Sequence, residues 1–377
     1  MAVDIGTGTQ DIFLFDSHLD LENGFKMVLP SPTMIINRRL HQATHQRQPV
    51  LLTGVTMGGG PSSWAAEDHA HSGLPTFATP DAARTFNDDL DQVQQMGIII
   101  VSEDEAARLP ADTQHIEMRD FDFASIQAAF ALFGVSLSDL DAVAVAVFDH
   151  GAAPADVSDR KFRFDYLDSR IRSANRLSAF AYPSDQIPAI MTRLQAVSAS
   201  ARDLDAPLVV MDTAPAAVLG ASLDPQVSRR SRVMIANVGN FHTLAFRLGP
   251  GKIEGVFEHH TGFLDQAKLE HFLIKLADGS LANEDVFDDK GHGALVYGDE
   301  PLLLDSPDFN VVVTGPRRNL LRNSHLKPYF AVPYGDMMIA GCFGLLAAAA
   351  DCLPDLRGPI LSTLTGSGAG VAPWDVE

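Results

Sequence analysis

A short pattern of strand, glycine turn and strand occurs twice in this chain, and it constrains the fold more than any other feature. The first copy covers residues 3–10 and the second covers residues 235–242. When the two copies are aligned, Asp4 matches Asn237 and both turns keep a glycine. A self-similar supersecondary unit indicates an internal repeat, and the repeat predicts that the chain is built from two related halves.

Two further pairs of segments support this interpretation. Residues 50–54 and 311–315 are both apolar strands that end in Thr-Gly. Residues 207–221 and 330–350 both run from an apolar strand into a segment rich in alanine and glycine. Because small residues let helices approach closely, we expect these two segments to form helices that pack against each other beneath a cleft.

The expected fold class is therefore α/β, with two mixed-sheet domains around a central cleft. We expect an N-terminal domain in residues 1–224, with an inserted subdomain in about residues 58–205, and a C-terminal domain in residues 231–377. A chain of 377 residues is long enough for two domains of ordinary size.

Composition excludes several classes of function. Acidic residues outnumber basic ones 48 to 28, for a net charge of −20, so we expect no nucleic-acid or anionic-membrane partner. The two cysteines, Cys342 and Cys352, cannot ligate an Fe–S cluster within one chain. The longest apolar run, residues 337–350, is too short to span a bilayer, and no leader segment is visible. We expect a cytoplasmic protein.

The first glycine turn has the chemistry of a phosphate site. Its glycines allow backbone N–H groups to converge on an anion, and its threonines add hydroxyl donors. Asp4 ends the first strand and can hold a hydrated Mg²⁺ ion. The simpler alternative is a tight hairpin with an incidental aspartate. The residues of this copy that we expect to contact the phosphates are Gly6, Thr7, Gly8, Thr9 and Gln10.

The second turn is a weaker copy. Asn237 replaces the aspartate, so it can accept a bond from a metal-bound water but brings no charge. We expect Gly239, Asn240 and His242 to contact the phosphates from this side. The alternative is a hairpin that has kept its shape and lost its role as a ligand.

Three further groups are candidates for nucleotide chemistry. Gly315 and Arg317 follow a buried strand and could face a flat base or a phosphate, although a basic surface turn has the same pattern. Asp212 ends an apolar strand and could act as a catalytic base, but an N-terminal helix cap is an equal alternative. Asp149 ends another strand and presents the same choice.

Clustered histidines are the least usual feature. His259 and His260 are adjacent, and His292 lies between two glycines. Such residues can bind a transition metal or shuttle protons. Histidines held by backbone hydrogen bonds in loops are the alternative.

The order of hairpin, Thr-Gly strand and small-residue helix resembles the superfamily of actin, sugar kinases and heat-shock chaperone ATPases. This resemblance implies a duplicated ribonuclease H-like fold that binds ATP and Mg²⁺ in its cleft. Residues 4–10 are similar to the first phosphate motif, residues 237–242 to the second and residues 314–317 to the adenosine motif. Asp212 is similar in position to the catalytic carboxylate of the chaperones.

More closely, residues 4–11, 237–240, 257–262 and 291–293 resemble a prokaryotic family catalogued as putative pyruvate formate-lyase activating enzyme. That description implies radical chemistry on S-adenosylmethionine, which needs three cysteines in a C-x-x-x-C-x-x-C pattern. Neither cysteine here has that spacing, so we reject this activity.

The resulting hypothesis is an ATP-binding protein, either a Mg²⁺-dependent ATPase or a phosphotransferase that acts on an unidentified small molecule. One alternative is a nucleotide-switched activator or scaffold for a protein partner. The other is a metal-dependent hydrolase that uses His259, His260 and His292.

Overall fold

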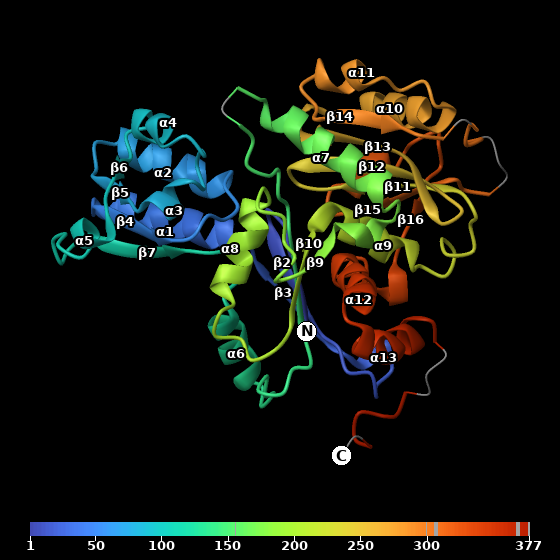
Figure 1. Cartoon of the computed structure of the whole chain (residues 1–377), viewed down its shortest axis with the longest axis horizontal. Coiled ribbons are helices and arrows are strands. Elements are labelled where there is room, and N and C mark those ends of the chain that lie inside the picture. Colours follow the sequence, from blue (N-terminus) through green and yellow to red (C-terminus); the bar gives the residue numbers. More distant parts are fainter. Residues whose placement is uncertain (155, 299, 305–307, 367–369, 376–377) are drawn as a thin grey trace.

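In the computed structural model, the described residues form three β-sheets and the helices that pack around them (Figure 1). Two sheets have six strands and the third has four. The structure describes residues 1–154, 156–298, 300–304, 308–366 and 370–375. The observed class is therefore α/β, as the sequence predicts.

The first sheet has the strand order β3-β2-β1-β8-β10-β9. Strands β1, β2 and β3 form an antiparallel meander, and β8 and β10 continue the sheet parallel to β1. β9 is antiparallel at the edge. The bounds are β1 Ala2–Ile5, β2 Thr9–Leu14, β3 Phe25–Pro30, β8 Val143–Val147, β9 Ala181–Pro183 and β10 Leu208–Asp212.

The second sheet repeats this arrangement in the order β14-β13-β12-β11-β15-β16. Strands β11, β12 and β13 form the meander, β15 is parallel to β11, and β16 is parallel to β15. β14 extends the antiparallel side. The bounds are β11 Val233–Val238, β12 His242–Gly249, β13 Lys252–His260, β14 Gly293–Val296, β15 Val311–Thr314 and β16 Tyr329–Phe330. The turn after β1 and the turn after β11 thus occupy matching places.

The third sheet is parallel throughout, in the order β6-β5-β4-β7. It lies to one side of the other two sheets (Figure 1) and has a separate hydrophobic core. The strands are β4 Val50–Gly54, β5 Thr76–Ala78, β6 Ile99–Ile100 and β7 Gln114–Met118. The nearby helices are α1 Pro32–Gln46, α2 Pro61–His71, α3 Pro80–Ala83, α4 Leu90–Gln95 and α5 Glu103–Ala106.

One expected pair of equivalent strands is wrong. Residues 50–54 form β4 of the third sheet, whereas residues 311–314 form β15 beside β11. The strand of the first sheet that corresponds to β15 is β8, because β8 pairs in parallel with β1 as β15 does with β11. Strand β8 lies within residues 58–205, the range expected for an inserted subdomain. An apolar strand that ends in Thr-Gly suits any buried parallel strand before a tight turn, so it does not identify a sheet. The domain limits stay a prediction.

The remaining helices cover the two larger sheets. They are α6 Phe123–Ala131, α7 Asp159–Ser173, α8 Thr192–Ser200, α9 Thr213–Ser222, α10 Gln266–Asp278, α11 Asn283–Phe287, α12 Ala340–Cys352 and α13 Pro354–Leu364. Short 3₁₀ helices are η1 Leu21–Asn23, η2 Leu177–Phe180, η3 Thr261–Phe263, η4 Arg318–Leu321 and η5 Pro333–Gly335. Within the described ranges, no helix is both long and apolar enough to cross a membrane.

Helices α9 and α12 pack closely against each other, which confirms the expectation drawn from their small residues. A Cβ atom at Gly220 would collide with the carbonyl oxygen of Ala340, and one at Gly344 would collide with that of Ala216. Both helices contribute to one hydrophobic core with strands of both six-stranded sheets. This contact therefore joins the two halves of the molecule.

The substitution Gly344→Ala tests this contact. We expect a loss of about 3 kcal/mol or more, because the added methyl group meets a backbone oxygen that cannot move alone. The matched control is Gly358→Ala on α13, where no atom lies near the added Cβ and helix propensity improves. Urea unfolding monitored by circular dichroism measures both. Equal stability of the two variants would contradict the close packing.

Candidate functional site

A cleft of about 1030 Å³ is lined by strands of the two six-stranded sheets and by loops, including the loops that follow β4 and β7 of the third sheet. Of the residues predicted from the sequence, those that line it are Asp4, Gly6, Thr7, Gly8, Thr9, Asp149, Asn237, Gly239, Asn240, His242, His260 and Gly315. The lining does not include Gln10, Asp212 or Arg317.

The two glycine turns meet directly in this cleft. A Cβ atom added to Gly8 in the first turn would lie 2.6 Å from Nδ2 of Asn240 in the second. The absence of a side chain at Gly8 therefore allows the turns to approach this closely. Segments more than 200 residues apart in the sequence form one wall of the cleft.

Each turn is closed by the same backbone hydrogen bond. The Gly6 N–H donates to the Thr9 carbonyl oxygen at 2.9 Å, and the Gly239 N–H donates to the His242 carbonyl oxygen at 3.0 Å. These two amide groups are therefore occupied in shaping the hairpins. The expectation that Gly6 and Gly239 contact phosphate thus applies to their turns rather than to their own N–H groups.

The amide groups beyond each closing bond are available. Thr7 and Gly8 in the first turn make no backbone N–H hydrogen bond within the described ranges, and neither do Asn240 and Phe241 in the second. All four residues line the cleft. Two pairs of unpaired donors thus lie at matching positions on turns that touch.

Two aspartates stand opposite each other beside the first turn. Asp4 on β1 pairs with Asp11 on β2, so their side chains share one face of the sheet. Thr213 Oγ1 donates to Asp4 Oδ1 at 2.6 Å. Asp11 Oδ1 is buried and has no hydrogen-bond partner among the described residues. Burial raises the pKa of Asp4 to about 6 and that of Asp11 to about 8.

Sequence reasoning did not select Asp11, although a signal for it exists. The closing bond of the turn joins Gly6 to Thr9, and counting outward along the hairpin pairs Ile5 with Gln10 and then Asp4 with Asp11. Gln10 points to the sheet edge instead, where its Nε2 donates to the carbonyl oxygen of Pro30.

Asp212 is held by two partners. Its Oδ2 accepts a hydrogen bond from Arg163 Nη1, and its Oδ1 accepts one from the Ala214 N–H at 3.1 Å, which caps α9. Both oxygens are therefore occupied, as in the helix-cap alternative. The catalytic role of Asp212 stays a prediction to which this geometry adds no support.

Asp149 is anchored in a similar way. Its Oδ1 accepts a hydrogen bond from the Gly151 N–H at 2.8 Å, and its Oδ2 accepts one from the Leu194 N–H at 2.9 Å. Burial raises the pKa of Asp149 against these two bonds. Asp149 lines the cleft, but its carboxylate shapes the loop after β8.

The loop after β15 brings one of its two predicted residues to the cleft. Gly315 lies at φ +94°, and a Cβ there would be 2.6 Å from the Val238 carbonyl oxygen. Its conformation therefore serves the close packing of β15 against β11. Arg317 is exposed, and its N–H donates to the same carbonyl oxygen at 2.9 Å. The role of Arg317 beside a base stays a prediction.

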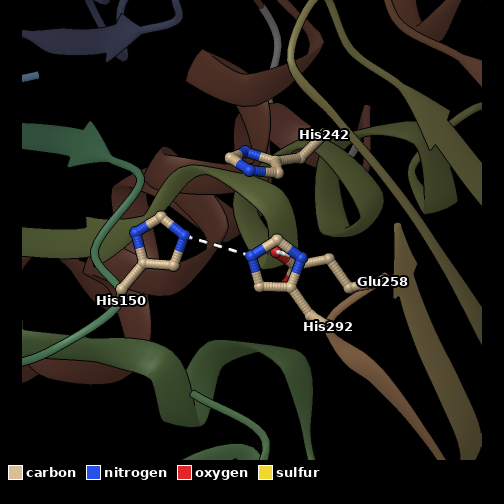
Figure 2. A group of neighbouring side chains, drawn as sticks. All are labelled: His150, His242, Glu258 and His292. Atoms are coloured by element: carbon tan, nitrogen blue, oxygen red, sulfur yellow. Dashed lines mark hydrogen bonds and ion pairs between the residues drawn. The ribbon is translucent and has the colours of Figure 1, made fainter. Parts of the chain in front are cut away.

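Three histidines form a group at the wall of the cleft. His150 after β8, His242 at the start of β12 and His292 before β14 converge next to Glu258 on β13, as Figure 2 shows. The Nε2 atoms of His150 and His292 are 3.2 Å apart. His292 Nδ1 lies 3.5 Å from Glu258 Oε1.

Of the expected trio of His259, His260 and His292, only His292 belongs to the group of possible metal ligands. Neighbouring side chains on a strand point to opposite faces, so His259 and His260 on β13 diverge. The His259 ring stacks on Phe272, and its Nε2 lies 3.1 Å from Asp289 Oδ2. His260 remains on the cleft side, with its ring centroid 4.6 Å from that of His292.

The clustered imidazoles are neutral in this environment. Burial lowers the pKa of His150 to about 3. Burial likewise lowers the pKa values of His242, His260 and His292, and the neighbouring histidines lower them further. The His242 ring also stacks on Phe148 with 4.2 Å between ring centroids. Uncharged imidazoles have free nitrogen lone pairs, so the cluster has the chemistry of a metal ligand set.

Arg163 on α7 connects the two halves behind this cluster. Its side chain is fully buried. In addition to its hydrogen bond to Asp212, Arg163 donates from Nε to Glu258 Oε2 at 3.1 Å and from Nη1 to the Asp149 carbonyl oxygen at 2.9 Å. One arginine among several in a polar segment gives no sequence signal of such burial.

Replacing Arg163 with methionine tests this connection. We expect Arg163→Met to lose about 3–5 kcal/mol at neutral pH, because two carboxylates then remain buried without a cation. The control is Arg172→Met on the same helix, where the ion pair with Asp168 is solvent-exposed and its loss has little effect. Urea unfolding measures the difference, and equal stabilities would refute it.

The two opposed aspartates predict a pH dependence. The folded-state pKa of Asp11 is about 8, above its value of about 4 in an unfolded chain, so the folded form keeps a proton that the unfolded form releases. The contribution of Asp11 to stability should therefore fall as pH rises between about 4 and 8 without divalent cations. The buried histidines contribute with the opposite sign, so the test is the difference between wild type and Asp11→Asn, which should shift in favour of the variant as pH rises. The exposed Asp185→Asn should show no such shift. Melting temperatures across this range measure the difference, and a shift in favour of wild type would contradict the prediction.

Comparison with known proteins gives one family. The family model described as "putative pyruvate formate-lyase activating enzyme (DUF1786)" matches residues 57–320, about seven tenths of the chain. No curated protein matches the sequence at the threshold applied. The matched region includes the third sheet after β4, the Arg163 helix, the second glycine turn and the whole histidine cluster. The chain belongs to this family.

Proposed function

We propose that this protein binds ATP with Mg²⁺ in the cleft and acts as an ATPase or a phosphotransferase on a small molecule. One observation carries the proposal: two matching glycine turns touch, and each brings to the same cleft two residues whose amide groups have no partner among the described residues. Converging backbone N–H groups form a concave anion site. Two such turns face to face suit a chain of phosphates rather than a single one.

The strand order of the two larger sheets supports the same conclusion. Each sheet has a three-stranded antiparallel meander followed by two parallel strands. This order resembles that of a ribonuclease H-like unit, and we propose that the two units around the cleft form a duplicated fold of the actin-like ATPase kind. Fold alone does not give function, so the proposal depends on the turns.

The chain's own residues would divide the binding as follows. The amide groups of Thr7 and Gly8 donate to phosphate oxygens from one side, and those of Asn240 and Phe241 donate from the other. Positioning and charge stabilisation are the main protein contributions to phosphoryl transfer, so rigid hairpins are suitable holders. Gly315 and Pro316, which also line the cleft, would lie beside the nucleoside.

The residues beside the first turn fit a Mg²⁺ ion. Asp11 Oδ1 is a buried oxygen without a partner, and Asp4 stands opposite it on the same face. Carboxylate oxygens and water are the ligands that Mg²⁺ prefers. Asp4 and Asp11 would hold the hydrated ion, with Asn237 accepting a bond from one of its waters. When bound, the ion neutralises phosphate charge.

The activity in the family's description is not part of this proposal. Radical activation with S-adenosylmethionine needs a cluster-binding triad of cysteines, and the sequence contains two cysteines in total. Cys342 is buried on α12, with its Sγ 3.1 Å from the Asp11 carbonyl oxygen. Cys352 lies ten residues further along the chain.

Titration calorimetry tests the proposal. We expect wild-type protein to bind one ATP per chain, more tightly with Mg²⁺ than with a chelator. Asp11→Asn should lose the Mg²⁺-dependent gain, about tenfold to a hundredfold in Kd, and keep the binding seen in chelator. Asp185→Asn is the matched surface control.

The absence of ATP binding by folded wild-type protein would overturn the proposal. A gain from Mg²⁺ that persists in Asp11→Asn would overturn the metal assignment alone. ADP release, measured with and without a metabolite library, then separates an enzyme from a nucleotide-switched activator, which binds ATP without appreciable turnover.

A further inference from the structure

We propose that His150, His242 and His292 form a binding site for a divalent transition-metal ion, separate from the carboxylates of Asp4 and Asp11. Figure 2 shows these three side chains next to Glu258, and two of them, His150 and His242, line the cleft. The existence of this site does not depend on nucleotide binding, because its ligands and its chemistry are different.

The distances suit direct coordination. In a tetrahedral site with Zn–N bonds of about 2.0–2.1 Å, two ligand nitrogens lie about 3.3 Å apart. The Nε2 atoms of His150 and His292 are 3.2 Å apart. One ligand atom from each of these two histidines, from His242 and from Glu258 falls within 4.8 Å of all the others.

The ligands come from distant parts of the chain. His150 lies in the loop after central strand β8 of the first sheet, whereas His242 begins β12 and His292 directly precedes β14 in the second. An ion bound to all three would join the two halves across the cleft. Ligands at strand ends are held more precisely than ligands on long loops.

Glu258 has the position of a supporting group. A histidine that ligates a metal through Nε2 usually donates its Nδ1–H to a carboxylate or carbonyl. His292 Nδ1 faces Glu258 Oε1 at 3.5 Å, and neither atom has a hydrogen-bond partner among the described residues. The other oxygen of Glu258 is fixed by Arg163. The carboxylate is thus already oriented toward the histidine that it would support.

The local charge also permits a cation. The one positive charge of Arg163 is paired with two carboxylates, Asp212 and Glu258. Imidazole ligands favour Zn²⁺, Co²⁺, Ni²⁺ or Cu²⁺ over Mg²⁺, whereas carboxylates and water favour Mg²⁺. The cleft therefore offers two ion sites of different selectivity.

The open coordination position faces the cleft. His150 and His242 belong to the cleft lining, whereas His292 lies behind it, fully buried. Three protein ligands leave a fourth position of a tetrahedral ion for water or a substrate. The class of ligand that fits this position is a small molecule with an anionic or hydroxyl oxygen, held in the cleft beside His150 and His242.

The test uses full-length protein stripped of metal, with Zn²⁺ in calorimetry and Co²⁺ in visible spectroscopy, and no nucleotide present. We expect one ion per chain, a four-coordinate Co²⁺ spectrum and no displacement by excess Mg²⁺. His242→Gln and His292→Gln should each weaken Zn²⁺ binding by more than about a hundredfold, and Glu258→Gln by about tenfold to a hundredfold. His45→Gln, at an exposed position on α1, is the control and should bind as wild type does.

Two results would overturn the proposal: no stoichiometric Zn²⁺ on folded wild-type protein, or unchanged affinity in both His242→Gln and His292→Gln. X-ray absorption on Zn²⁺-loaded wild type counts imidazole ligands directly, so the test survives if a variant fails to fold. Fewer than three imidazoles would also refute the assignment. ATP binding by a protein that takes up no Zn²⁺ would refute this site and leave the nucleotide site standing.

Discussion

The buried guanidinium of Arg163 constrains how the two six-stranded sheets are placed relative to each other. It bonds to Asp212 at the end of a first-sheet strand and to Glu258 in the second sheet. Two buried carboxylates and one arginine are stable only if all three stay paired, because each unpaired charge is costly in a dry interior. This constraint, together with the glycine contact between α9 and α12, fixes the cleft and so places both candidate ion sites along it.

The division of labour inside the cleft follows from ligand chemistry. Beside the first glycine turn lie carboxylates and unpaired amide groups, which suit phosphate and Mg²⁺. His150, His242 and His292 place three imidazoles beside Glu258, which suit a softer ion. A phosphotransferase needs both a phosphate holder and a place for the acceptor. If both proposals hold, an ion at the histidines would hold the acceptor's oxygen in the same cleft as the phosphates.

The sequence predicted the features that adjacent residues specify, and it missed the features that depend on contacts between residues far apart in the chain. The glycine turns were predictable because a strand, a tight turn and a strand are specified by adjacent residues. The place of β4 was not, because an apolar strand does not encode which sheet it joins. Asp11 could be found only from hairpin register, and His259 was assigned to the cluster although strand alternation turns it away. The burial of Arg163 depends on Asp212 and Glu258, far away in the sequence.

The central claim is that the two glycine turns hold one polyphosphate between them. Amide hydrogen exchange of full-length protein, followed by mass spectrometry with and without ATP and Mg²⁺, tests it most directly. The account predicts that peptides covering residues 5–10 and 238–243 both become protected, at the same nucleotide concentration. Protection of one turn alone, or of neither while nucleotide is bound elsewhere, would contradict it.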